Sequence, residues 1–266
     1  MRLDRQFFLD KQRAFAYEPG WSPESRPVTD VSMRAASAYR YFDFVMVGFV
    51  VVLVCSNLIG PAKIASVEVP LWGPFVFGAG AIFFPISYVF GDILTEVYGY
   101  AQARKVIWAG FAALLFASLM AAIVVALPPA PFWQHQQAYE IAFGNTWRIV
   151  LASMAAYFCG EFVNAYVLAK MKVWTHGRAL WSRTIGSTIC GEAVDSAIFY
   201  PLAFYGSGII PNEALPAVML AQFFLKTLVE VAFTPATYAA VGYLKRAEGV
   251  DHFDHATDFN PFKLAG

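Results

Sequence analysis

Five ionisable side chains occur in the middle of long apolar stretches of this 266-residue sequence, where charge is costly. Glu192 and Asp195 lie three residues apart, so they share one face of a predicted helix. Lys226 and Glu230, four residues apart, share a face of the next helix, and Glu161 lies on another. Because two neighbouring buried carboxylates need a cation, we expect Lys226 to pair either with Glu230 on its own helix or with Asp195 across the bundle. Such groups normally face a bundle interior or a wet cavity, and they often mark a transport path.

Further polar and aromatic side chains at similar depth complete a predicted binding site for a small polar or cationic solute. These additional candidates come from four of the apolar stretches and are Asn57, Tyr88, Asp92, Asn164 and Phe223. Amide and carboxylate groups offer hydrogen-bond donors and acceptors, and aromatic rings can stack on a flat ligand. The competing interpretation is purely structural, with the acids paired to Lys226 or reached by water at the membrane interfaces.

The composition places these groups in a membrane protein. Hydrophobic residues make up 58% of the sequence, charged residues only 14%, and the mean hydropathy is +0.51, which is not the balance of a water-soluble surface. A helix needs about twenty mostly apolar residues to cross a bilayer core. Six stretches meet this requirement, at 42–62, 74–97, 106–127, 149–169, 184–205 and 216–244. The predicted fold class is therefore all-α, a polytopic bundle of six transmembrane helices.

Lysine and arginine residues predict which side of the membrane each connection occupies, because basic connections stay in the cytoplasm. Sixteen of the nineteen basic residues fall on one side of a six-span arrangement. Both termini are therefore expected in the cytoplasm, with an N-terminal tail at 1–41, a transporter domain at 42–246 and a C-terminal tail at 247–266. The C-terminal tail contains several Asp and His residues and is expected to be a short, polar, mobile end.

Other functional classes are disfavoured by what the sequence lacks. It contains no HExxH motif, no GxSxG nucleophile elbow and no glycine-rich phosphate loop, so an enzyme is not expected. The formal net charge is zero, which gives no electrostatic basis for a nucleic-acid partner. No metal site and no cofactor are predicted.

Three segments of the sequence resemble one known family. They read FPISYVFGDILTEVYGYAQARKVIW at 84–108, GEAVDSAIF at 191–199 and KTLVEVAFTPATYAAVGYLKR at 226–246. In order and spacing they are similar to the queuosine precursor transporter family, also called the vitamin uptake transporter family. The similarity extends from about Ser56 to Arg246, nearly the whole apolar region, while the first forty residues look like an addition.

The resemblance implies a bacterial inner-membrane importer of 7-cyano-7-deazaguanine and 7-aminomethyl-7-deazaguanine, bases that feed synthesis of the tRNA nucleoside queuosine. The expected partners are such a small molecule and membrane lipid, and a homo-oligomer stays open. The guanine-like edge of these bases offers two N–H donors that one carboxylate can accept together. Glu192 or Asp195 is the first candidate for this role, followed by Glu161. Asn57 and Asn164 are candidates to bind the carbonyl and the ring nitrogens of the base. Tyr88 or Phe223 is the candidate to pack against the face of its ring.

Two other interpretations stay open beside the importer. A substrate-capture subunit of an energy-coupling-factor vitamin importer is also a six-helix membrane protein, but it needs ATPase partners. A structural bundle fits the apolar surface and leaves the central charges unexplained. For an importer, we expect a secondary transporter or facilitator with alternating access around a midplane site, and the carboxylates are compatible with proton coupling.

Overall fold

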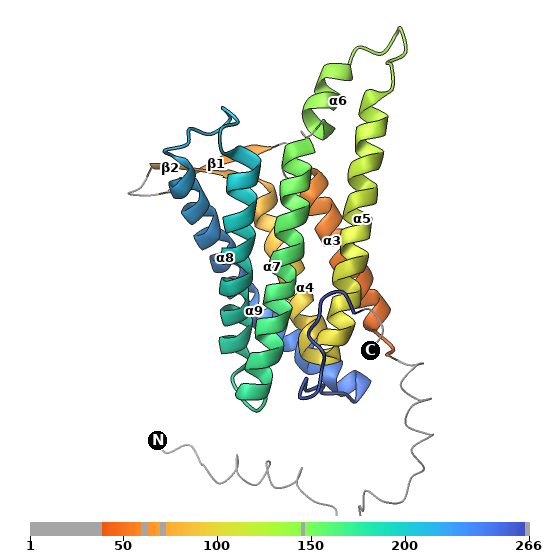
Figure 1. The fold of residues 1–266 in the computed structure, drawn as a ribbon, viewed down its shortest axis with the longest axis vertical. Coiled ribbons are helices and arrows are strands. Elements are labelled where there is room, and N and C mark those ends of the chain that lie inside the picture. Colours follow the sequence, from red (N-terminus) through yellow and green to blue (C-terminus); the bar gives the residue numbers. More distant parts are fainter. Residues whose placement is uncertain (1–38, 60–62, 70–72, 145–146, 264–266) are drawn as a thin grey trace, which may run out of the picture. The chain divides into compact units, whose positions relative to one another are not determined.

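The computed structural model describes residues 39–59, 63–69, 73–144 and 147–263, and within these ranges the chain is mostly helical (Figure 1). The long helices are α3 (Phe42–Ile59), α4 (Gly80–Tyr98), α5 (Tyr100–Ala126), α7 (Trp147–Trp174), α8 (Leu180–Phe204) and α9 (Leu215–Glu248), with a short helix α6 (Gln136–Phe143) between α5 and α7. Most of the predicted N-terminal tail, residues 1–38, lies outside the described residues.

A two-stranded hairpin connects α3 to α4. Strand β1 (Ile64–Val69) pairs antiparallel with β2 (Gly73–Gly78), with Ile64 opposite Gly78. The all-α prediction misses this hairpin, and the second predicted span began at Pro74, which lies inside β2. A short apolar run bounded by glycine and proline cannot be told from the start of a helix by hydropathy alone. Helix α4 begins six residues later than that prediction.

Four helical segments among the described residues are long and apolar enough to cross a membrane. They are α3, α5, the segment from α6 through α7, and α9, with mean hydropathies between 1.3 and 2.4. Their outward faces carry large apolar side chains, among them Phe44, Phe116, Leu151 and Phe224, each at least 63% exposed. An apolar outer surface of this kind suits contact with lipid.

Helices α4 and α8 have 19 and 25 residues, but their polar side chains point into the bundle. Helix α4 contacts α3, α5, α7 and α9, and its Asp92 and Glu96 are completely buried. On α8, Glu192 is also completely buried. These charged residues lower the mean hydropathy of both helices, but their side chains face the bundle interior and not the outer surface.

Helices α7 and α8 pack most closely where Gly160 meets Gly191. A Cβ atom at Gly160 would lie 3.1 Å from the carbonyl oxygen of Gly191, and a Cβ atom at Gly191 would lie 2.9 Å from that of Gly160. Only residues without a side chain allow two helix backbones to approach this closely. The close approach brings Glu161, next to Gly160, and Glu192, next to Gly191, to the same level of the bundle.

The C-terminal segment, residues 250–263, packs beside the start of α5, so the expectation of a mobile tail is wrong (Figure 1). The backbone N–H of Tyr100 donates a hydrogen bond to the carboxylate of Asp254 at 3.1 Å. The buried guanidinium of Arg104 donates to two backbone carbonyl oxygens of the segment, both at 2.8 Å. A buried arginine therefore obtains its acceptors from the C-terminal segment.

Aromatic side chains explain why this segment docks. The ring of Phe259 lies 4.8 Å from that of Tyr100 and 5.1 Å from that of Tyr166, measured between centroids. The indole N–H of Trp108 donates to the carbonyl oxygen of Pro261 at 2.8 Å. The Asp and His content of the segment favoured a solvated tail, whereas its phenylalanines supply the apolar area that holds it against the helices.

Replacing Arg104 by alanine should release the C-terminal segment. Hydrogen bonds from a charged donor contribute about 1.5–3 kcal/mol each, so losing two should raise the open population by at least about tenfold. Limited chymotrypsin digestion of a protein carrying a C-terminal tag should then remove the tag at least about tenfold faster than from the wild type. The matched control is Lys105→Ala, whose side chain is exposed. Equal cleavage of all three proteins would contradict the proposed role of Arg104.

Candidate functional site

Lys226, Glu192 and Asp195, here called the Lys226 triad, meet between α8 and α9. The Lys226 ammonium donates to Glu192 Oε2 at 2.9 Å and to Asp195 Oδ2 at 2.8 Å. None of the three residues is more than 8% exposed. Of the two pairings left open by the sequence, the one across the bundle forms, and Lys226 joins both acids of α8 rather than Glu230.

Two aromatic residues of α4 lie beside the triad. The ring centroid of Phe84 is 4.3 Å from the Lys226 ammonium, a cation–π contact. The ring of Tyr88 packs 5.9 Å from that of Phe84. The Tyr88 hydroxyl is buried and has no hydrogen-bond partner among the described residues. Helix α4 therefore supplies both packing for the cation and an unused hydrogen-bond donor.

Glu161 on α7 and Glu230 on α9 are buried carboxyl groups whose oxygens accept no hydrogen bond within the described part of the chain. Glu161 follows Gly160, whose Cβ position lies 3.1 Å from the Cβ of Asp195, so it lies close to the triad. One of its oxygens is 3.0 Å from the position that a Cβ would take at Gly91, and glycine there leaves it room. Buried polar groups in native proteins are normally bonded, so unsatisfied carboxyls indicate a place for a proton or a ligand.

Asp92 and Asn164 form a separate contact between α4 and α7. The Asn164 amide donates to Asp92 Oδ1 at 2.9 Å. Asp92 Oδ2 and Asn164 Oδ1 have no hydrogen-bond partner among the described residues, and both residues are completely buried. Asp92 also interacts electrostatically with Glu230. The predicted residues of α4, α7, α8 and α9 thus form one buried polar interior.

Two predicted site residues have other contacts. Asn57 accepts a hydrogen bond from the Ser153 hydroxyl at 2.8 Å and donates to the carbonyl oxygen of Leu53 at 2.9 Å, so it joins α3 to α7. Phe223 is half-buried, and its ring packs edge-on against its neighbour Phe224, with centroids 5.5 Å apart. The structure brings neither residue to the Lys226 triad by these contacts.

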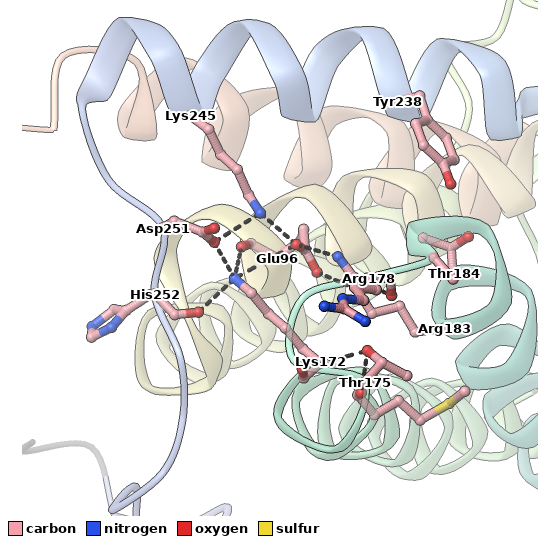
Figure 2. A network of polar contacts seen from close by, with 12 residues as sticks. Glu96, Lys172, Thr175, Arg178, Arg183, Thr184, Tyr238, Lys245, Asp251 and His252 are labelled. Atoms are coloured by element: carbon pink, nitrogen blue, oxygen red, sulfur yellow. Dashed lines mark hydrogen bonds and ion pairs between the residues drawn. The ribbon is translucent and has the colours of Figure 1, made fainter. Parts of the chain in front are cut away.

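A second group of charges, here called the Glu96 network, joins α4, α7, α8, α9 and the C-terminal segment (Figure 2). Arg183 donates two hydrogen bonds to the Glu96 carboxylate, both at 2.8 Å, and Lys245 donates one at 2.6 Å. Lys172 and Lys245 both bind the carboxylate of Asp251, at 2.7 and 2.8 Å. The network contains three cations and two acids.

In the sequence, Lys172, Arg183 and Lys245 indicated only which side of the membrane each connection occupies. Their contacts with Glu96 and Asp251 were not predicted. The available signal was the spacing of Phe84, Tyr88, Asp92 and Glu96 at intervals of four, which places them on one face of α4. That face runs from the Lys226 triad to the Glu96 network. It therefore connects the two charged groups through the bundle.

The Asp251 side chain, outside the helices, is 48% exposed. Partial burial acts to raise the pKa of its carboxyl, but the hydrogen bonds from Lys172 and Lys245 outweigh this effect and hold the pKa below its ordinary value. Asp251 therefore stays ionised between two lysines at neutral pH.

The fold and these charges define a class of protein. An apolar helical exterior around a buried, partly unsatisfied polar interior is the construction of polytopic membrane proteins that handle polar solutes. The chain belongs to the vitamin uptake transporter family, whose family model matches residues 78–240. It is therefore a transporter rather than an enzyme.

The names of two relatives agree with this family. A probable queuosine precursor transporter of Bacillus subtilis is 31% identical over 198 residues, covering 74% of this chain and 82% of the relative. A queuosine precursor transporter of Escherichia coli is 26% identical over 165 residues, covering 61% of this chain and 71% of the relative. No solved structure matches the chain.

Removing the cation of the triad should destabilise the protein strongly. Lys226→Met leaves two buried carboxylates without their shared partner, at a cost of about 3–5 kcal/mol, so thermal unfolding in detergent should shift down by several degrees. Lys226→Met combined with Glu192→Gln and Asp195→Asn should recover most of the loss, because no uncompensated charge remains. Lys263→Met, at an exposed position, is the control. An unchanged melting temperature for Lys226→Met alone would contradict the ion pairing.

The Asp251 carboxyl should make stability depend on pH in the acidic range. Its pKa is lower in the folded protein than in the unfolded chain, so its stabilisation is complete above the unfolded pKa of about 4 and is lost as pH falls through the folded pKa. The difference in melting temperature between wild type and Asp251→Asn should be constant from about pH 7 to about pH 5 and should shrink below about pH 4. A difference that stayed constant down to about pH 3 would argue against the two lysine contacts.

Proposed function

We propose that the protein imports the queuosine precursors 7-cyano-7-deazaguanine, 7-aminomethyl-7-deazaguanine or both across a bacterial inner membrane. The observation that carries the proposal is the buried polar interior beside the Lys226 triad, where carboxyl and hydroxyl groups lack partners among the described residues. A guanine-like base presents donors and an acceptor that such groups can bind. The relatives named queuosine precursor transporters support the same class of solute.

The proposed topology has six membrane spans, α3, α4, α5, α7, α8 and α9, with both termini in the cytoplasm. Helices α4 and α8 are counted as spans because their charges point into the bundle and not toward lipid. The excess of Lys and Arg in the proposed inner connections supports this orientation. In this arrangement residues 1–41 and 247–266 flank a transporter domain at 42–246, and the Glu96 network lies at the cytoplasmic side.

The proposed binding region is lined by Tyr88, Asp92, Glu161, Asn164, Glu192, Asp195, Lys226 and Glu230. Asn57 and Phe223 are kept as candidates, although the contacts described above do not connect them to it. In an alternating-access cycle one side of the site is closed while the other is open. The Glu96 network joins four helices and the C-terminal segment by short ion pairs, so it acts as the closure on the cytoplasmic side. Release of the base into the cytoplasm would require these contacts to separate.

Two alternative functions differ from this proposal in whether the protein binds the base and whether it can move the base without partner proteins. A substrate-capture subunit would bind the base but would not move it without ATPase partners. A structural bundle would bind nothing, and the unpaired buried carboxyls of Glu161 and Glu230 argue against it, because packing alone does not need them. Proton-coupled and facilitated import are both compatible with these acids.

The test is uptake of radiolabelled 7-cyano-7-deazaguanine into liposomes that contain the purified chain alone. The wild type should accumulate label, and Asp195→Asn should lower the rate by about tenfold or more, because it removes one partner of a buried charge pair. Asp43→Asn, at an exposed position on α3, is the matched control and should behave as wild type. Binding without uptake would favour the capture subunit, and neither binding nor uptake by the wild type would overturn the proposed substrate.

A further inference from the structure

The carboxyl groups in and around the Lys226 triad differ in how many of their oxygens are free to accept a hydrogen bond from a ligand. Lys226 already occupies one oxygen of Glu192 and one of Asp195. Both oxygens of Glu161 are buried and accept no hydrogen bond in the described part of the chain. A ligand that presents two parallel N–H donors needs both oxygens of one carboxylate. Glu161 meets this requirement, and the two acids first favoured from the sequence do not.

An unused donor lies beside this carboxyl. The Tyr88 hydroxyl is 2.8 Å from the position that a Cβ would take at Gly160, the residue that precedes Glu161. The Tyr88 ring also lies close to α8, because its Cε1 is 3.0 Å from the position that a Cβ would take at Gly191, the residue before Glu192. Because the Tyr88 hydroxyl is buried and has no partner among the described residues, it can donate to a ligand without breaking an existing bond.

Glu230 also has two unsatisfied oxygens, but its surroundings are different. It lies on α9, one helical turn after Lys226, whereas Glu161 lies on α7 next to Gly160. The Tyr88 hydroxyl lies 2.8 Å from the Cβ position at Gly160, the residue before Glu161. The combination of two free acceptors with a free donor is therefore found at Glu161.

We infer that Glu161 and Tyr88 read the aminopyrimidinone edge of a guanine-like base, with both Glu161 oxygens accepting its ring N–H and exocyclic amine and the Tyr88 hydroxyl donating to its carbonyl oxygen. The inference rests on the proposed function and assigns its specificity to two residues. The Lys226 triad then positions this pair: its ion pairs hold α8 and α9 together, and the Phe84 ring contacts both Lys226 and Tyr88. Both queuosine precursors share this edge, so the same contacts bind either base.

The experiment measures equilibrium binding of radiolabelled 7-cyano-7-deazaguanine to the purified full chain, with unlabelled guanine and hypoxanthine as competitors. Hypoxanthine lacks the exocyclic amine, so the wild type should prefer guanine by about a hundredfold or more, because a site built to accept that amine leaves a buried oxygen unpaired without it. Glu161→Gln should lower affinity for the labelled base by a similar factor and should reduce the preference to within about threefold. Tyr88→Phe should weaken binding of both competitors and keep the preference, because it removes only the contact to the carbonyl oxygen.

Glu213→Gln, an exposed glutamate before α9, is the matched control and should bind as wild type. Size-exclusion profiles and melting temperatures establish that each variant is folded. If Glu161→Gln does not fold, Glu161→Asp keeps the carboxylate in a shifted position, and it should bind more weakly while still preferring guanine.

Three results would overturn the inference. The first is wild-type affinity in Glu161→Gln or in Glu161→Asp, and the second is an unchanged guanine preference in Glu161→Gln. The third comes from the same assay with unlabelled 7-aminomethyl-7-deazaguanine as an additional competitor. It is a loss confined to that base, which would mean that Glu161 binds the ammonium group instead of the shared edge. Failure of the wild type to bind either precursor is a different outcome, because it would overturn the proposed function itself.

Discussion

The ammonium of Lys226, buried between Glu192 and Asp195, is the interaction on which the arrangement of the core depends. A lysine inside an apolar bundle stays charged only if acids surround it, and acids so placed stay charged only with the lysine. The two acids are three residues apart on α8, so one ammonium can reach both only when α8 and α9 have a single relative register. The ring of Phe84, whose centroid is 4.3 Å from the ammonium, extends this constraint to α4.

The buried polar groups divide into two ion-paired groups and a set of groups whose partners are incomplete. The Lys226 triad and the Glu96 network are joined by short ion pairs, which fix the helices at two levels. Glu161, Glu230 and the free oxygens of Asp92 and Asn164 have incomplete partners within the described residues, and so has Glu192 Oε1 in the triad. Satisfied pairs hold a fold together, whereas unsatisfied groups reduce stability unless a ligand or a proton completes them. The division separates the residues that hold the bundle from those available for solute.

Part of this organisation is predictable from the sequence, and the physical reason for each success or failure is specific. Hydropathy predicts apolar helices well, because lipid contact demands long apolar runs, and helical spacing places Glu192 and Asp195 on one face. The paired strands at 64–69 and 73–78 were missed because short apolar runs do not reveal their secondary structure. The docked C-terminal segment was missed because composition does not show which backbone carbonyls a distant Arg104 will bind. The free state of Glu161 could not be predicted either, since it depends on which acids Lys226 selects.

The distribution of charge along the interior limits the kind of solute that can pass. Around the triad, one lysine faces three carboxyls when Glu161 is included, whereas the Glu96 network has three cations and two acids. An anionic solute would be repelled by the first group, and a strongly cationic one would meet an excess of positive charge at the second. A neutral base with several hydrogen-bonding groups avoids both penalties, because it can replace lost water contacts at the unsatisfied carboxyls without carrying charge through the bundle. The charge distribution therefore disfavours an anionic solute and is compatible with a heteroaromatic base, on physical grounds that are independent of the relatives' names.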